Sequence, residues 1–500
     1  MTDKPYDEPT PQESLDPEDW DEFRAQAHRM LESALDRMQS SRQGRVWTEL
    51  PADIKDALKS PLPRQGLGTD DVISRMETLL PYGAGNTNPR FFGWVHGSGT
   101  PSNILAEMAA SSMNANVGGR DHGAIYVEKQ VISWCRELFG FPEAASGIVV
   151  SGTSMATIIA IKVARDARLD FASRRDGVCG HGLVGYTSTE THSCVARAFD
   201  MVGLGTDALR RIPANDRFEI DMDALRAAIA TDRAAGLTPF VVIGTAGTVN
   251  VGAIDPLDEL ADLAKAENLW FHIDGAFGAL GVLSERARDR LSGIKRADSL
   301  AFDFHKWLHV NYDAGFALVR DETLHRATFT DRPDYLKAKE RGLAGGNPWP
   351  VEYGPELSRG FRALKVWAQL AEFGTDRLGR MITRNCYQAS YLGEQVAMTP
   401  GLELLAPVAL NICCFRHVVH GLPDAVLDAM NDEIVIQLQE QGIAAPSTTQ
   451  LHGRTAIRVN ITNHRTARKD LDILLSEIVR IAASQEVAAV REAALSALKD

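Results

Sequence analysis

The stretch that decides the fold is SLAFDFHKWLHVNYDAG, residues 299–315. It begins with a short apolar run and continues into Lys306, which lies between Phe304 and Trp307. Lysine is rarely buried without a partner. Burial disfavours the charged form of the amine, so the pKa of Lys306 is expected to fall and its nitrogen to become a nucleophile. The stretch therefore predicts a buried strand that ends at a chemically active lysine.

Similar apolar runs precede this stretch along the chain. GIVV (147–150), PFVVIGT (239–245) and LWFHID (269–274) are each followed by a turn or by a longer segment with helical spacing. Buried strands that alternate with helices are typical of an α/β fold with a largely parallel sheet. Functional groups in such sheets lie at the carboxyl ends of the strands. The end of each run is therefore the place to look for chemistry.

Four segments divide the chain. Residues 1–19 are acidic and poor in apolar side chains, which predicts a disordered tail. Residues 20–85 are predicted to be a helical segment whose first helix is capped by Asp16. Residues 86–375 form the predicted large α/β domain, and residues 376–500, with LELLAPVALNICCFRHV and TAIRVNITN as strands, form a smaller α+β domain.

Composition limits the classes of function. The chain has 500 residues and a formal net charge of −13, which argues against nucleic acid as a partner. It contains no apolar run of membrane-spanning length and no signal-peptide pattern at its N-terminus. Its six cysteines are scattered and form no CxxC pair, so neither a metal site nor a disulfide framework is expected. These features predict a cytoplasmic location.

The turn VSGTSMAT (150–157) leaves a strand and opens a helix. Its small residues let a phosphate approach, and the free N–H groups at the start of the helix favour an anion. Thr153 and Ser154 can add hydroxyl donors. On its own, this pattern is more typical of an ordinary strand-to-helix turn.

Asp274 and Lys306 give the turn a chemical context. Asp274 directly follows an apolar strand, where a carboxylate can cap the next helix or pair with a protonated heterocyclic nitrogen. Lys306 follows the next strand and suits a Schiff base to an aldehyde. A phosphate cradle, a carboxylate for a pyridinium nitrogen and a Schiff-base lysine together are what pyridoxal 5′-phosphate requires. His192, in STETHSCVARA, is placed in the chain to stack on such a ring, although a lone histidine is more often structural.

With these residues the chain resembles the group II pyridoxal-phosphate-dependent decarboxylases, most closely the aromatic-L-amino-acid decarboxylase branch. The resemblance extends from about residue 20 to about residue 485. Its matching segments are NPRFFGW, SGTSMAT, THSCVARA, GTAGTVNVGAIDPL, FHIDGAFGA, DSLAFDFHKWLHVNYDAG, RPDYLK and RGFRALKVW. The resemblance implies the fold-type I architecture of pyridoxal-phosphate-dependent transferases and a homodimer with active sites at the subunit interface.

The resemblance also implies four catalytic residues. Lys306 would be the internal aldimine lysine, and Asp274 would pair with the pyridine nitrogen. His192 would stack over the ring. Tyr335, in RPDYLK, matches the tyrosine of a mobile catalytic loop that would run from about 328 to about 350.

Five further positions carry over as cofactor-binding residues. Ala276 would pack under the ring, and Thr248 would lie near Asp274 and support it. Thr153, Ser154 and His305 would hold the phosphate. No metal is implied.

The implied reaction is decarboxylation of an aromatic L-amino acid such as Trp, Tyr, Phe or DOPA to the amine and carbon dioxide. It would pass through an external aldimine and a quinonoid, and Tyr335, assisted by His192, would protonate the α-carbon. Two alternatives keep the cofactor: a decarboxylase for Glu or Asp, and an aldehyde synthase or aminotransferase. Arg458, in AIRVN, is the candidate carboxylate-binding arginine of an aminotransferase. A non-enzymatic relative is disfavoured because the catalytic residues are intact.

Several positions depart from the aromatic branch. Arg120, Asp121 and His122, in GRDHGAIY, and His96, in GWVHGSGTP, stand where aromatic-specific relatives carry small or apolar residues. They predict either a more polar, acidic substrate or a supporting salt link such as Arg120 to Asp121. Asp303 replaces an Asn close to the expected phosphate, and its carboxylate is expected to point away from it.

Overall fold

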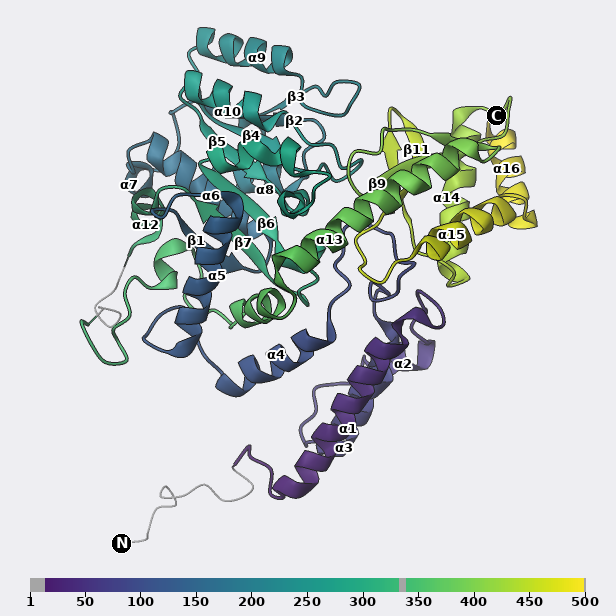
Figure 1. The fold of residues 1–500 in the computed structure, drawn as a ribbon, viewed down its shortest axis with the longest axis horizontal. Coiled ribbons are helices and arrows are strands. Elements are labelled where there is room, and N and C mark those ends of the chain that lie inside the picture. The colour runs from purple at the N-terminus through teal and green to yellow at the C-terminus, as the bar shows by residue number, and fades with distance from the viewer. Residues whose placement is uncertain (1–13, 332–338, 499–500) are drawn as a thin grey trace.

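The computed structural model describes residues 14–331 and 339–498, and its largest part is a seven-stranded sheet (Figure 1). The strand order is β1-β7-β6-β5-β4-β2-β3. All neighbours from β6 to β3 are parallel, whereas β7 is antiparallel to both β1 and β6. The strands are β1 (Ser146–Val150), β2 (Leu183–Ser188), β3 (Leu209–Ile212), β4 (Thr238–Thr245), β5 (Trp270–Asp274), β6 (Ser299–Asp303) and β7 (Gly315–Val319). The predicted largely parallel sheet is confirmed.

Helices cover this sheet and are joined to it by short turns (Figure 1). α6 packs against β6 and β7, and α10 packs against β4 and β5. The helices of this part are α4 (Pro101–Met113), α5 (Gly123–Phe139), α6 (Thr153–Arg168), α7 (Ser173–Asp176), α8 (Cys194–Met201), α9 (Met222–Ala234), α10 (Leu257–Ala266), α11 (Phe304–Trp307) and α12 (Glu322–Phe329). Short 3-10 segments are η3 (Thr206–Ala208), η4 (Gly278–Leu283), η5 (Arg288–Arg296) and η7 (Pro350–Tyr353).

β6 crosses the apolar centre of the sheet, and its carboxyl end reaches an edge of the sheet that is not apolar. All five of its residues are buried, as expected for a strand covered on both faces. At its end the chain meets the start of α6 and the start of β7. A Cβ on Gly315 would lie 2.4 Å from the Cα of Gly152, so only glycine lets β7 pass this close to the turn that opens α6.

A four-stranded sheet of order β10-β11-β9-β8 forms a second unit. Its strands are β8 (Leu402–Leu404), β9 (Ile412–His417), β10 (Ser447–Leu451) and β11 (Arg454–Asn460). Its helices are α14 (Asp424–Glu440), α15 (Arg468–Ala482) and α16 (Gln485–Ala497). The long helix α13 (Ala363–Met398) leads into it, and Gly374 interrupts that helix with a φ of 65°. The strands expected in LELLAPVALNICCFRHV and TAIRVNITN are present as β8, β9 and β11.

The N-terminal segment forms an arm that extends from the body (Figure 1). It contains α1 (Trp20–Gln39), η1 (Ser40–Arg42), α2 (Ala52–Ala57), α3 (Thr69–Leu79) and η2 (Leu80–Tyr82), and α1 packs on α3. The expectation that Asp16 caps the first helix is wrong: the Asp19 side chain accepts from the N–H groups of Asp21 and Glu22. This later start places both acidic side chains in the first turn, where the helix dipole favours them.

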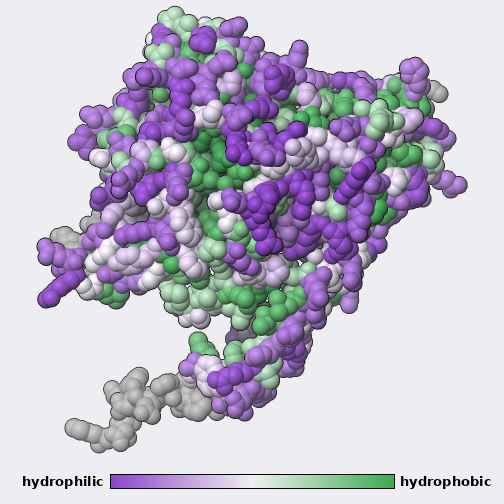
Figure 2. All heavy atoms as spheres, in the orientation of Figure 1, coloured by the Kyte–Doolittle hydropathy of each residue, from purple (hydrophilic) through white to green (hydrophobic). Residues whose placement is uncertain are grey.

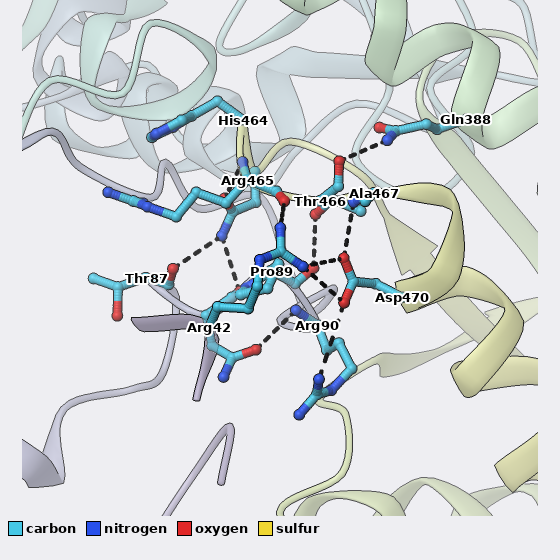
Figure 3. A network of polar contacts seen from close by, with 12 residues as sticks. Arg42, Thr87, Pro89, Arg90, Gln388, His464, Arg465, Thr466, Ala467 and Asp470 are labelled. Atoms are coloured by element: carbon cyan, nitrogen blue, oxygen red, sulfur yellow. Dashed lines mark hydrogen bonds and ion pairs between the residues drawn. The ribbon is translucent and has the colours of Figure 1, made fainter. Parts of the chain in front are cut away.

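A buried polar network joins this segment to the smaller sheet unit (Figure 3). The Asp470 carboxylate, 1% exposed, lies 3.0 Å from Arg42 Nη1 and 3.9 Å from Arg90 Nη1. Thr466 Oγ1 donates to the Pro89 carbonyl at 2.6 Å. These contacts fix the chain just before Trp94, which contributes to the site described below.

The division into segments 1–19, 20–85, 86–375 and 376–500 stays a prediction, and residues 1–13 of the expected acidic tail lie outside the described residues. Within the described ranges, the structure contains no helix with the length and apolar character needed to cross a bilayer.

Candidate active site

Lys306, Asp274 and His192 line one pocket of about 290 Å³. Asp274 is the last residue of β5, and Lys306 follows β6 in the short helix α11. His192 lies in the turn between β2 and α8. The three residues meet because the carboxyl ends of neighbouring parallel strands open on the same edge of the sheet. The sequence prediction that brings them together is therefore matched by their positions.

Asp274 is a buried carboxylate that faces the pocket. It is 2% exposed, and its Oδ1 accepts the Ala276 N–H at 3.1 Å. Among residues 14–331 and 339–498, no cationic side chain lies within 4.0 Å of it. Burial raises the pKa of Asp274, and the positive charge of Lys306 opposes that rise. A desolvated carboxylate without a cation beside it fits a protonated ring nitrogen.

Lys306 is less dry than its sequence surroundings predict. Its side chain is 21% exposed, and Nζ lies 2.8 Å from Asp303 Oδ2. Asp303 Oδ1 also accepts the backbone N–H of Thr153 at 2.7 Å. The Asp303 carboxylate thus points at the lysine and at the start of α6. The sequence carries no sign of this ion pair, because the position of Asp303 indicated only an expected phosphate nearby.

His192 lies at the mouth of the pocket with a fixed ring orientation. Its Nδ1 accepts the backbone N–H of Cys194 at 3.1 Å, so the hydrogen of the neutral ring sits on Nε2. Burial lowers the pKa of His192, Asp274 opposes the shift, and Lys306 adds to it. Ala276 lines the same pocket. A planar ring held between His192 and Ala276 is consistent with these positions.

The start of α6 forms a cradle for an anion, which we call the anion cradle and define as Gly152, Thr153, Ser154 and His305. Ser154 is exposed, whereas the Oγ1 of Thr153 is buried without a partner. His305 Nδ1 accepts the Ala314 N–H at 3.1 Å, so its Nε2 carries the hydrogen and can donate. An unsatisfied hydroxyl and the free N–H groups of a helix start fit a phosphate.

Thr248 has a structural task in the turn after β4, and its expected support of Asp274 stays a prediction. It is buried, and its Oγ1 accepts the Ala253 N–H at 3.0 Å, so it closes the turn after β4. It is not among the residues that line the pocket. Thr245 is paired with Asp274 across β4 and β5 and does line it. The signal for Thr245 was its position as the last residue of the run PFVVIGT.

The polar residues of GRDHGAIY do not line this pocket. The Arg120 guanidinium stacks 4.8 Å from the Trp349 ring, and Asp121 Oδ1 accepts from Tyr126 Oη at 2.7 Å. Within the described part of the chain, no ion pair joins Arg120 to Asp121. His122 Nε2 lies 3.3 Å from the Asn116 carbonyl. Each of these side chains thus has a contact of its own within the described chain.

His96 packs against Trp94, which lines the pocket. Its ring is 6.0 Å from Trp94 and 5.7 Å from Tyr312, measured between centroids. Burial lowers the pKa of His96, and the nearby Lys306 adds to that shift. A neutral imidazole among aromatic rings supports the wall that Trp94 and Val95 form.

Arg458 joins three parts of the pocket wall. It is 3% exposed, and burial lowers its pKa to about 10. Its Nη1 donates to the Trp94 carbonyl at 2.8 Å, its Nη2 to the Val249 carbonyl at 2.6 Å, and its Nε to the Asn250 carbonyl at 3.0 Å. The guanidinium is thus committed to backbone, which leaves it poorly placed to hold a substrate carboxylate.

The wall from β10 is another feature that the sequence analysis missed. Ser447 and Thr449 line the pocket, and Thr449 Oγ1 donates to Asn250 Oδ1 at 2.8 Å. Tyr335 lies outside the described residues, so its part in the site stays a prediction. The described residues contain no group of three or more His, Cys, Asp or Glu that could hold a metal ion.

The chain belongs to the family of pyridoxal-dependent decarboxylases, whose conserved domain matches residues 51–418. It is 32% identical to the aromatic-L-amino-acid decarboxylase of Bacillus atrophaeus, over 92% of this chain and 96% of that protein. It is 30% identical to the L-2,4-diaminobutyrate decarboxylase of Rhizobium meliloti, over 81% and 80% of the two chains. The crystal structure of mouse CSAD superposes with a TM-score of 0.85 at 26% identity, covering 93% of this chain and 99% of that one.

These similarities confirm the fold-type I architecture and the family resemblance seen in the sequence. The protein is a pyridoxal-phosphate-dependent amino-acid decarboxylase, and pyridoxal 5′-phosphate is its cofactor. Relatives of comparable identity carry different substrates in their names, so the family does not by itself define which amino acid is used.

Proposed function

We propose that the protein decarboxylates an aromatic L-amino acid to the corresponding arylalkylamine. The observation that carries this proposal is the apolar surface in the pocket that Lys306 lines. Trp94, Val95, Val249 and Phe277 supply apolar surface. An aromatic side chain gains by leaving water for such a surface.

Each site residue has a proposed task. Bound pyridoxal phosphate supplies an electron sink for the bond that breaks at the substrate carboxylate. Asp274 holds a proton at the ring nitrogen, and the anion cradle binds the phosphate. His192 keeps its Nε2–H toward the pocket and orients the reacting groups. Tyr335 would supply the proton that the α-carbon takes up in place of the lost carboxylate, and Lys306 would hold the cofactor aldehyde when no substrate is bound.

The acidic-substrate alternative needs a cation for the side-chain carboxylate, and the aminotransferase alternative needs one for the α-carboxylate. Arg458 is the candidate, but its donors bind the carbonyls of Trp94, Val249 and Asn250. Leaving such carbonyls unpaired in a buried site is costly. The geometry therefore favours an uncharged side chain over an acidic one.

A basic side chain is the second candidate. Glu190 Oε2 lies 3.4 Å from Asn250 Nδ2, which places a carboxylate beside a residue that lines the pocket. A carboxylate at this edge would attract an ammonium group on the substrate. A basic substrate would use the same catalytic residues as an aromatic one, and only the substrate side chain in contact with the pocket wall would differ.

Product analysis with a panel of amino acids tests the proposal. The purified, cofactor-loaded protein is incubated with carboxyl-labelled Trp, Tyr, Phe, DOPA, Glu, Asp and 2,4-diaminobutyrate. Released carbon dioxide is counted, and products are identified by mass. Release with an aromatic substrate and formation of its amine supports the proposal. Release only with Glu or Asp, or amino-group transfer without carbon dioxide, contradicts it.

We also propose that the protein works as a homodimer in the cytoplasm. Apolar side chains gather on α4 and on the arm, where Leu105, Met108 and Met76 are 56%, 52% and 42% exposed. Figure 2 shows this apolar surface on the underside of the body, next to the arm. Contiguous exposed apolar surface is typical of an interface. Sedimentation of the purified protein tests the dimer, and a monomer at all concentrations would contradict it.

A further inference from the structure

We propose that Asp303 is the internal anion of the cradle and a positioning residue for Lys306. Its carboxylate accepts the Thr153 N–H, a donor that a phosphate bound in the cradle would also use. Asp303 thereby sets how tightly the cradle holds an anion. This inference rests on the proposed role of the anion cradle in phosphate binding.

Three donors converge on this one carboxylate. Oδ1 accepts the Thr153 N–H at 2.7 Å, and Oδ2 lies 2.8 Å from Lys306 Nζ. His305 Nε2 lies 3.6 Å from Oδ2, which places the third donor just beyond hydrogen-bond distance. The residue is 3% exposed. A carboxylate in this position brings negative charge to the start of a helix, as a phosphate would.

The backbone keeps this carboxylate in place. Asp303 is the last residue of β6, and its N–H donates to the Ala276 carbonyl at 3.0 Å. On the side of β7, its partner across the strand pair is Gly315. A Cβ on Gly315 would lie 2.8 Å from Asp303 Oδ1, so the strand leaves just enough room for the carboxylate. The side chain is therefore a built part of the cradle and not a mobile surface group.

The negative charge of Asp303 lowers the affinity of the cradle for an anion. A phosphate that enters the cradle meets the negative charge of Asp303 at close range, and Asp274 adds a second carboxylate to the same site. The ion pair with Lys306 offsets part of the negative charge of Asp303. Repulsion between like charges at a few ångströms weakens anion binding. The cradle is thus tuned below the affinity that its hydroxyl and N–H donors could give.

The substitution Asp303→Asn isolates this effect. The amide Oδ1 can still accept the Thr153 N–H, so the shape of the cradle is kept while its negative charge is removed. The matched control is Asp298→Asn. Asp298 also accepts a strand N–H, that of Phe271 at 2.8 Å, but it precedes β6 and so lies at the opposite end of the strand from the cradle.

The first measurement is the binding of inorganic phosphate to the cofactor-free full chain, by calorimetry and by the shift of the melting temperature. We expect Asp303→Asn to bind phosphate about tenfold more tightly than the unsubstituted chain, as removal of one like charge in a partly screened site implies. Asp298→Asn should match the unsubstituted chain. Unchanged or weaker phosphate binding by Asp303→Asn would overturn the inference.

The second measurement is the dissociation constant of pyridoxal phosphate, followed by the visible absorption of the loaded protein. We expect it to fall in Asp303→Asn in parallel with that for phosphate. If the Asn variant does not fold, Asp303→Ser, which also keeps an acceptor oxygen, is measured in its place with the same expected result. Failure of the unsubstituted chain to bind pyridoxal phosphate would instead refute the role of the site, so the two failures are distinguishable.

Discussion

Asp255 is expected to make the end of β4 sensitive to pH. Its carboxylate is 1% exposed and accepts the backbone N–H groups of Ile220 at 2.8 Å and Thr245 at 2.7 Å. Burial raises the pKa of Asp255 from 3.8 to about 7, although these two hydrogen bonds oppose the shift. Because Thr245 lines the pocket beside Asp274, the ionisation of Asp255 reaches the site through a single backbone contact.

The sign of the effect follows from where the proton is held more tightly. The folded chain binds it more tightly than the unfolded chain, so its contribution to stability is complete below pH 3.8 and is lost as the pH rises to about 7. At 1.36 kcal/mol per pKa unit, the full loss is about 4 kcal/mol. Above about pH 7 no further loss is expected from this residue.

Asp255→Asn removes the titration and keeps one acceptor oxygen for the two N–H groups. We expect the free energy of unfolding of the unsubstituted chain to fall relative to that of the variant between about pH 4 and about pH 7. Guanidinium unfolding of both proteins at each pH gives this difference, in which other titrating groups cancel. A difference that is constant with pH, or that grows in favour of the unsubstituted chain, would refute the reasoning.

Three further predictions concern the site and its scaffold. Lys306→Ala should abolish carbon dioxide release from the loaded protein, and steady amine production by that variant would defeat the assignment. Tyr335→Phe should lower the amine yield and raise the aldehyde yield, which mass analysis of products detects; an unchanged ratio removes Tyr335 from its role. Glu128→Ala leaves Arg359 buried and unpaired, since the two side chains are 2% and 1% exposed and 2.5 Å apart. It should cost about 3–5 kcal/mol of unfolding free energy, and a loss within the noise of a surface substitution would contradict this.

The sequence was sufficient for the parts of the fold that depend on local pattern. Apolar runs located β1, β4, β5 and β6 because buried strands exclude polar residues. The meeting of Asp274 with Lys306 followed from one topological rule for parallel sheets. Pattern could not place Arg458, because its partners Trp94 and Val249 are distant along the chain and are contacted only through backbone carbonyls. Every residue has a backbone carbonyl, so an arginine that binds only carbonyls has no signal in a single sequence.

The ion pair between Asp303 and Lys306 could not be predicted from the sequence for a different reason. Asp303 and Lys306 are three positions apart, but the direction of each side chain depends on the end of a strand and the start of α11. The sequence showed a carboxylate near an expected phosphate, which is an electrostatic conflict. In the structure the carboxylate accepts the Thr153 N–H and pairs with Lys306, so it has two close partners of its own.

In this site, the residues that carry out the reaction and the residues that contact the substrate side chain come from different parts of the fold. Asp274 and Lys306 are carried by the ends of buried strands, where a change of position would disturb the core. The wall facing them is assembled from Trp94, the turn at Val249 and the strand β10, and Arg458 holds these parts together through their backbone. Side chains on such a wall can change without moving Arg458, because Arg458 binds the backbone carbonyls and not the side chains. This arrangement gives a physical reason why relatives of similar identity share decarboxylation and yet are named for different amino acids.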